Sequence, residues 1–245
     1  MDKIKELNEI IKDSNNIVFF GGAGVSTESG IPDFRSTDGL YNQHYDYPPE
    51  MILSHTFFMN HPDVFYKFYF DKLVNTDILP NECHKTLKKL EDMGKLKAVI
   101  TQNIDGLHEM ANTKNVITLH GTIYKNHCVN CHKEYSLEDM INKKPIPKCD
   151  CGGIIKPDVV LYEEPLNDDD MMNAIKYISE CDTLIIGGTS LNVYPAAGLI
   201  NYFNGKHLIV INKDSLRVPG IDLEINDSIA KVFSEVNLDV WRNFS

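Results

Sequence analysis

The sequence has no long apolar run and is poor in positive charge. It nowhere approaches the roughly 20 consecutive apolar residues that a membrane-spanning helix needs, and residues 1–14 carry charges at a spacing unlike that of a secretory signal. Lys and Arg number 24 against 35 Asp and Glu, so the net charge is −11, which disfavours nucleic acid and anionic lipid as partners. We therefore expect a cytoplasmic protein without nucleic-acid or membrane partners. We also expect it to be a monomer.

The composition is otherwise that of a globular protein. Its 245 residues, 42% of them hydrophobic, suit one large domain or a large domain with a small insert. Cysteines stay reduced in the cytoplasm. The 6 cysteines are therefore expected in a metal site or in the core, and not in disulfides.

The chain is organised around a glycine-rich segment that follows a short buried strand. Residues 16–20 are β-branched and aromatic, and Gly21, Gly22 and Gly24 follow at once. Glycine lets backbone N–H groups approach a ligand, and a short helical turn over 25–29 would point its N-terminus at the same place. This arrangement is typical of a pyrophosphate site. A tight turn without a ligand stays the alternative, because the G-x-G-x-x-G spacing of a dehydrogenase is missing.

Polar residues follow the ends of two further predicted strands. Residues 97–101 lead into Asn103 and Asp105, and residues 116–119 lead into His120. The carboxyl ends of parallel strands are where open α/β sheets bind ligands. Asp105 could accept a hydrogen bond from a ligand amide, or it could cap the following helix as an Asx turn. Both interpretations stay open.

Two histidines are candidates for a proton-transfer residue. Histidine is the side chain best suited to move a proton near neutral pH. His120 ends a strand next to other polar strand ends, and Gly121 leaves room for a ligand. His108 is the competing candidate, but its position after Gly106 and Leu107 predicts the start of a helix.

A second glycine loop, Gly188, Thr189 and Ser190, follows the predicted strand 183–186 and suits a phosphate. The strand at 207–211 ends at Asn212, a position that reads ribose hydroxyls in dinucleotide-binding folds.

Two pairs of cysteines lie in a predicted insert at about 122–157. Paired thiolates at this separation indicate a closed structural zinc ribbon, in a segment too small to fold on an apolar core. The expected ligands are Cys128, Cys131, Cys149 and Cys151. Four unligated cysteines are the alternative. The second pair is Cys-x-Cys where zinc ribbons have Cys-x-x-Cys, so His127 or His132 are conceivable substitute ligands.

Four segments, in order, resemble the signatures of the sirtuin (Sir2-like) family of NAD-dependent protein deacylases, in its bacterial type. They are Gly-Ala-Gly-Val-Ser-x-x-Ser-Gly-Ile-Pro-Asp-Phe-Arg (22–35), Gln-Asn-Ile-Asp (102–105), His-Gly (120–121) and Gly-Thr-Ser-Leu-x-Val-x-Pro-Ala-Ala (188–197). With the cysteine-rich insert they cover most of residues 17–215.

The resemblance implies an α/β fold: a Rossmann-like parallel sheet with helices on both faces, plus a small zinc-ribbon module. It assigns 1–35, 84–121 and 156–245 to the NAD-binding part, 36–83 to a helical, cofactor-loop part and 122–155 to the zinc-binding module. We expect 154–164 to return to the main sheet and 191–197 to be extended.

The resemblance also implies roles for individual residues. NAD would bind to Gly22, Ala23, Gly24, Thr27, Asp33, Phe34, Arg35, Gln102, Asn103, Ile104, Asp105, His120, Gly188, Thr189, Ser190, Asn212, Lys213 and Ile229. His120 would be the general base, with Asn103 positioning ribose and water. An acylated-lysine peptide would add as a strand between two segments, Val160, Leu161, Tyr162 and Glu163 on one side and Leu191, Asn192, Val193 and Tyr194 on the other. One zinc ion would be structural.

The implied reaction is NAD-dependent deacylation of protein lysine, which transfers the acyl group to ADP-ribose and releases nicotinamide. Mono-ADP-ribosyl transfer at the same site, or a non-catalytic module that binds NAD or zinc, stay as alternatives. Tyr69 and Lys72 stand at the Tyr-x-x-Arg spacing of the sirtuins that remove acidic acyl groups. Because lysine cannot bind a carboxylate as the bidentate arginine fork does, we predict a preference for acetyl or another neutral acyl group.

Overall fold

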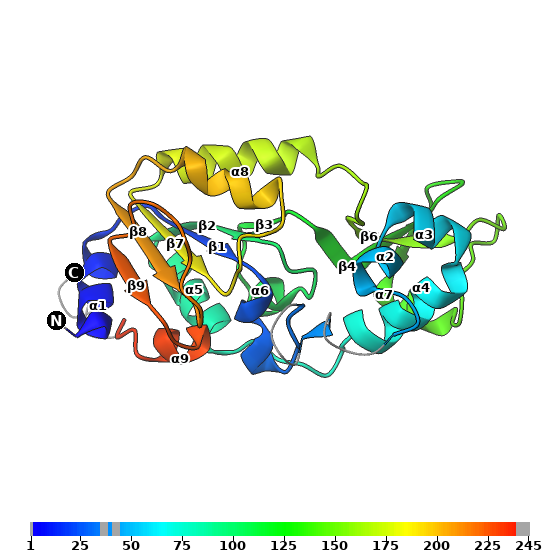
Figure 1. The fold of residues 1–245 in the computed structure, drawn as a ribbon, viewed down its shortest axis with the longest axis horizontal. Coiled ribbons are helices and arrows are strands. Elements are labelled where there is room, and N and C mark those ends of the chain that lie inside the picture. Colours follow the sequence, from blue (N-terminus) through cyan, green and yellow to red (C-terminus); the bar gives the residue numbers. More distant parts are fainter. Residues whose placement is uncertain (1, 35–38, 41–44, 239–245) are drawn as a thin grey trace.

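A computed structural model describes residues 2–34, 39–40 and 45–238. Arg35 lies outside the described residues, as does part of the predicted cofactor loop. Figure 1 shows a large lobe, which holds a parallel sheet between helices, and a small lobe, which holds β4, β6 and the helices α2, α3, α4 and α7.

The large lobe is built on six parallel strands. They are β1 (Ile17–Gly21), β2 (Leu96–Thr101), β3 (Val116–Thr118), β7 (Thr183–Gly187), β8 (His207–Ile211) and β9 (Leu223–Ile225). Their order is β3-β2-β1-β7-β8-β9, with every adjacent pair parallel. The strand order reverses between β1 and β7, which is where doubly wound sheets bind ligands. The predicted Rossmann-like sheet is confirmed.

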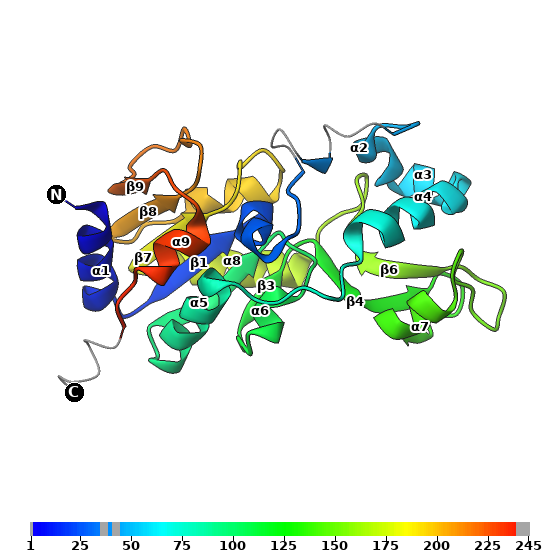
Figure 2. The same ribbon diagram turned by 90° about the horizontal axis from the view of Figure 1, so that it is seen from below.

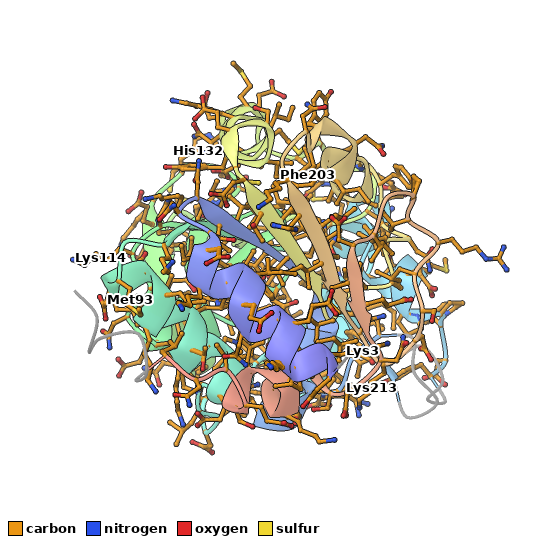
Figure 3. All side chains as sticks on the ribbon, turned by 90° about the vertical axis from the view of Figure 1, so that its left-hand side faces the viewer. Lys3, Met93, Lys114, His132, Phe203 and Lys213 are labelled. Atoms are coloured by element: carbon orange, nitrogen blue, oxygen red, sulfur yellow. The ribbon has the colours of Figure 1, made fainter. Side chains whose placement is uncertain are left out.

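Helices cover both faces of this sheet (Figures 1 and 2). One face carries α1 (Lys3–Asp13), α5 (Glu82–Asp92) and α9 (Ile229–Ser234), and the other carries α8 (Asp168–Glu180) and the 3₁₀ segment η5 (Ala196–Tyr202). Figure 3 shows α1 lying in front of the strands, with Lys3 at its start beside β9, where its Nζ donates to Glu224 O at 2.7 Å. Every residue of β1 and β7 is buried, as expected for central strands covered on both faces.

Local sequence signals set the start and end of α5. The side chain of Asn81 accepts from Cys83 N at 3.0 Å, and the ring of His84 accepts from Asn81 N at 3.2 Å, so the two residues form a capping box. Gly94 follows the helix with a φ of 71°, the left-handed conformation that commonly ends helices.

The small lobe holds an antiparallel sheet of order β5-β4-β6. Its strands are β4 (Gly121–Cys128), β5 (Glu134–Ser136) and β6 (Ile155–Val159), with the short helix α7 (Leu137–Asn142) after β5. Because β6 pairs with β4, the prediction that 154–164 returns to the main sheet is wrong. The eight residues of β4 extend from the end of β3 into the small lobe and offer β6 an edge there.

Aromatic helices pack against this sheet. They are α2 (Pro49–Ile52), α3 (His55–Asn60), α4 (Pro62–Phe68) and its π-helical continuation η4 (Tyr69–Leu73). Phe65, Tyr66 and Tyr69 are fully buried, and Tyr66 Oη donates to Ile155 O on β6. These rings therefore form the core of the small lobe.

Nowhere in the described ranges is a helix both long enough and apolar enough to cross a bilayer.

Candidate active site and metal centre

The two glycine loops contact each other at the carboxyl ends of β1 and β7. Gly24 N donates to Gly188 O at 2.7 Å, and Gly22 N donates to Gly187 O at 3.2 Å. A Cβ on Gly24 would lie 2.8 Å from Gly188 Cα, so a side chain would force the loops apart. Glycine is therefore required here for the approach of the loops. The N–H groups of Gly22 and Gly24 are bound to protein carbonyls, contrary to the expectation that they face a ligand.

A buried hydrogen-bond network joins the glycine segment to the residues after β2. Ser26 Oγ donates to Asp105 Oδ2 at 2.6 Å and accepts from Asn103 Nδ2 at 3.0 Å. Ser26, Asn103 and Asp105 are 1%, 9% and 8% exposed. Burial raises the pKa of Asp105, and the hydrogen bonds from Ser26 and Leu107 oppose that rise. The network fixes the amide of Asn103 beside the carboxylate of Asp105.

Ser26 is a residue that the sequence reasoning missed. It lies inside the first signature, and a hydroxyl directly after a glycine turn was the signal available. Asp105 also accepts from Leu107 N at 2.9 Å, at the start of α6 (Leu107–Met110). The carboxylate therefore forms the Asx-type cap that was the alternative interpretation, and its second oxygen bonds to Ser26.

His120 is held in one tautomer by the backbone. Its Nδ1 lies 3.0 Å from Gln102 O, and a carbonyl oxygen can only accept, so the proton is on Nδ1 and the Nε2 lone pair remains to take up another. Burial lowers the pKa of His120, and the hydrogen bond to Gln102 O only partly offsets this. The ring is therefore neutral near pH 7, as a general base must be.

Gly121 fixes the direction of the chain after His120. Its φ is 77°, and a Cβ there would lie 1.8 Å from Asp158 O. His120 O accepts from Val160 N at 2.9 Å. The backbone of the histidine is thus held by both β4 and the segment after β6.

His108 cannot act as the base. It lies in α6, as predicted, and is 1% exposed. Its ring centroid is 4.6 Å from that of His84, and burial, followed by the charge of His84, lowers the pKa of His108 well below its usual range.

Gln102 links the second glycine loop to this group. Its Oε1 accepts from Thr189 Oγ1 at 3.0 Å, whereas its buried Nε2 has no hydrogen-bond partner among the described residues. A buried donor without a partner is expected next to a polar ligand. The segments predicted to bind a ligand after β1, β2, β3 and β7 therefore lie at one edge of the sheet, although the sequence places the first and the last more than 160 positions apart.

Some of the predicted cofactor residues have other contacts. Asn212 Nδ2 donates to Asp214 O at 2.8 Å. Ile229 is 3% exposed in the main core, and its Cδ1 lies 2.1 Å from where a Cβ on Gly187 would be. Phe34 packs against the aromatic core of the small lobe.

One predicted peptide-binding segment is paired with the helices of the small lobe. Tyr162 N donates to Leu53 O at 2.9 Å, and Tyr162 O accepts from His55 N at 3.0 Å. Glu163 has a φ of 77°, and its carboxylate accepts from Thr56 N at 2.9 Å. These bonds hold one edge of the segment in place.

The other predicted segment is not extended, so that expectation is wrong. Leu191 has a φ of 52°, residues 191–195 form no strand, and Ala197 N donates to Val193 O at 2.9 Å. The turn follows from the short path between β7 and η5. Tyr194 is 74% exposed.

The four predicted cysteines come together in the small lobe. Cys128 Sγ lies 3.4 Å from Cys151 Sγ, and Cys131 Sγ lies 3.6 Å from Cys149 Sγ. All four sulfurs are within 4.8 Å of one another, and tetrahedral Zn–S bonds of about 2.3 Å would place sulfurs about 3.8 Å apart. The cluster fits a structural zinc ion.

The surroundings of the cluster favour thiolates. The backbone N–H of Cys151, followed by the phenol of Tyr135, lowers the pKa of Cys149 to about 6. A Cβ on Gly153 would lie 2.7 Å from Cys128 Sγ, so this glycine leaves room for the sulfur. His127 pairs with Asp158, and the ligand group brought together consists of the four sulfurs. The substitute histidine ligands are therefore unnecessary.

Comparisons with known proteins agree with this geometry. Residues 22–195 match the Sir2 family. A protein of Clostridium perfringens named NAD-dependent protein deacetylase is 60% identical over 240 residues, which cover 96% of this chain and 98% of the relative.

Two solved structures have the same fold. A Sir2 with deacetylated p53 peptide and 3′-O-acetyl-ADP-ribose has a TM-score of 0.89 at 36% identity, covering 95% of this chain and 96% of that one. A Sir2 with p53 peptide and NAD⁺ has a TM-score of 0.84 at 37% identity, with the same coverage.

Proposed function

The chain belongs to the Sir2 family and is an NAD-dependent protein deacetylase, and we propose that its acyl-transfer site is the edge of the sheet where His120, Asn103 and Asp105 meet. The observation that carries this assignment is the orientation of His120. With Nδ1–H bound to Gln102 O, only Nε2 can accept a proton. The His120 ring that carries this nitrogen is held at the ligand-binding edge of the sheet.

The residues present fit NAD as the co-substrate. Gln102 Nε2 is a buried donor without a partner among the described residues. The contact of Gly24 with Gly188 joins the two glycine loops into one continuous surface. When bound, NAD would supply an electrophilic ribose carbon, with which the acyl oxygen would form a bond as the bond to nicotinamide breaks. Ala23, Thr27 and Ser190 are proposed to bind the pyrophosphate.

The side chains at this edge of the sheet have separate roles in the proposed reaction. Asp105 accepts from the carboxamide of nicotinamide and keeps that ring oriented, while Ser26 keeps the carboxylate in place. Asn103 positions ribose and water. His120 Nε2 takes up the proton of a ribose hydroxyl, so that this hydroxyl can receive the acyl group. The products are deacylated lysine, nicotinamide and 2′-O-acyl-ADP-ribose.

An acylated-lysine peptide is the proposed substrate. The related structures with p53 peptides support this class of ligand. The segment from Val160 to Glu163 is the better candidate for backbone pairing, because its contacts with Leu53, His55 and Thr56 hold it rigidly before a peptide arrives. Leu191 to Tyr194 would contact the peptide through a turn.

Four thiolates with no open position give the zinc ion a structural role and no part in the reaction. We further propose a cytoplasmic location, because four cysteines that serve as metal ligands need a reducing compartment. We also propose that the protein is a monomer. Light scattering on the purified zinc-loaded protein tests the monomer. The proposed division of the chain is the predicted one, with β6 moved to the zinc-binding module because it pairs with β4.

Incubation of the zinc-loaded protein with an acetyl-lysine peptide tests the function. Peptide mass and free nicotinamide are measured with and without NAD. We expect both products only with NAD, and their loss in His120→Ala. His207→Ala serves as the control, because His207 begins β8 at the opposite end of the strands. Deacetylation without NAD, or full activity of His120→Ala, would overturn the assignment.

A further inference from the structure

The two cysteine pairs differ in the hydrogen-bond donors that their own loops supply. In the first pair, Cys128 Sγ accepts from the backbone N–H of Asn130 at 3.4 Å. The second pair is one residue shorter, so the position two residues after Cys149 is the ligand Cys151 itself. The shorter loop therefore has no counterpart of Asn130, a donor residue that is not itself a ligand.

Tyr135 supplies a second donor to Cys149 from another part of the lobe. Its phenol Oη donates to Cys149 Sγ at 3.0 Å. Tyr135 lies in the middle of β5 and is 9% exposed, so its ring is held by the sheet. Each of the two N-terminal cysteines of the pairs thus has a donor that is not itself a ligand, although the two donors come from different places.

Two lysines reinforce this contact. Lys133 Nζ lies 5.2 Å from the centroid of the Tyr135 ring, and Lys143 Nζ lies 5.8 Å from it. A cation over an aromatic ring withdraws electron density from it, which strengthens the phenol as a donor. Lys133 Nζ also pairs with Asp150 Oδ2 at 3.0 Å, and Asp150 is the residue between Cys149 and Cys151.

We propose that Tyr135 is a positioning residue for the zinc ligand Cys149, and that its hydroxyl replaces the backbone donor which the shortened Cys-x-Cys loop lacks. Hydrogen bonds from groups around a metal site fix the direction of a ligand and stabilise its charged form. A zinc ion with four thiolates carries a net negative charge, so each donor to sulfur also offsets that charge.

The hydroxyl can be tested apart from the ring. Tyr135→Phe keeps the aromatic packing and removes the donor alone. We expect zinc affinity, measured on the full chain by competition with a chromophoric chelator, to fall by about tenfold or more, the range found when groups around a metal site are removed. Tyr177→Phe is the matched control, because Tyr177 is a partly buried tyrosine on α8. The zinc affinity of this variant should equal that of the wild type.

Cobalt substitution gives a readout that loss of packing would not move. With Co²⁺ in place of zinc, four bound thiolates give a charge-transfer band whose energy reports the donors to sulfur. We expect this band to shift in Tyr135→Phe while its intensity stays that of four thiolates. Unchanged zinc affinity together with an unchanged band would overturn the proposal, and so would an equal loss in Tyr177→Phe.

Lengthening the short loop tests the compensation itself. Insertion of one glycine between Asp150 and Cys151 restores the Cys-x-x-Cys spacing and a backbone donor at the position that Asn130 holds in the first loop. In the Tyr135→Phe background, this insertion should recover most of the lost zinc affinity. If a folded insertion variant with four bound thiolates shows no recovery, Tyr135 does not replace a loop donor and the proposal fails.

Discussion

Replacement of Ser26 by alanine should weaken both the fold and the acyl-transfer site. The hydroxyl donates to Asp105 Oδ2 at 2.6 Å and accepts from Asn103 Nδ2 at 3.0 Å, and all three residues are buried. Alanine removes both bonds and leaves one carboxylate oxygen and one amide donor without these partners. Neither group can turn to water without disturbing the loop that it belongs to.

The size of the effect follows from the two lost bonds. A hydrogen bond to a charged group contributes about 1.5–3 kcal/mol and a neutral one about 1 kcal/mol, so Ser26→Ala should lower the free energy of unfolding by about 3 kcal/mol. For a chain of this size that is a fall in Tm of roughly 6–12 °C. The hydrogen bond from Ser26 lowers the pKa of Asp105. Its loss should raise that pKa further and move the acid limb of nicotinamide release to higher pH.

Thermal unfolding and nicotinamide release as a function of pH measure the two effects. Ser179→Ala is the control, because the Ser179 hydroxyl bonds to Lys176 O at an exposed site on α8, where a change within about 0.5 kcal/mol is expected. If Ser26→Ala melts with the control and its pH profile superimposes on that of the wild type, the network does not hold the site together.

Four further predictions concern other parts of the molecule. Gly121→Ala should lower the melting temperature of the protein well below that of Gly220→Ala. Both glycines have a φ of 77°, but a Cβ on Gly121 would lie 1.8 Å from Asp158 O, whereas a Cβ on Gly220 would have nothing within 4 Å. Equal melting temperatures would contradict this. Removal of zinc by a chelator should speed amide exchange in β4, β5 and α7 and leave β1 and β7 protected, because only the small lobe depends on the metal; uniform exchange would argue against this division.

Burial lowers the pKa of His84 from 6.5 to about 4, so the unfolded chain binds a proton that the folded chain does not, and stability should fall as the pH drops from 6.5 towards about 4. The ceiling for this one group is about 3 kcal/mol. His84→Gln, which can keep the capping box, should flatten that part of a denaturant-unfolding series, and an unchanged slope would show that His84 does not titrate in this way. Acetyl-lysine peptides should be processed faster than succinyl-lysine peptides, because Lys72 replaces arginine and its Nζ lies 5.8 Å from the ring of Tyr45; the reverse order in a side-by-side assay would refute the predicted acyl preference.

The parts that were predicted correctly depend on neighbours along the chain. β1, β7 and β8 are apolar runs bounded by polar residues, and α5 carries its own cap in Asn81 and its own end in Gly94. The grouping of the four cysteines follows from the spacing of the two pairs. The position of His120 at the edge of the sheet was predictable because a strand leads directly into it, and carboxyl ends of parallel strands meet at one edge.

The parts that were missed depend on contacts between distant segments. Nothing near Ser26 shows that its hydroxyl reaches Asp105, 79 positions away. The sequence around β6 reads as a strand for either sheet, and only the free edge of β4 decided which one it joined.

By itself, the sequence determined most strands of the parallel sheet, which polar residues follow them and which cysteines can share a metal, because these properties arise from side-chain periodicity and spacing. Only the tertiary structure decided the network of Ser26, the burial of His108 and the contact of Tyr135 with Cys149. Hydrogen bonds and burial are settled by which surfaces meet when the chain folds, and that choice is made by the packing of the whole molecule.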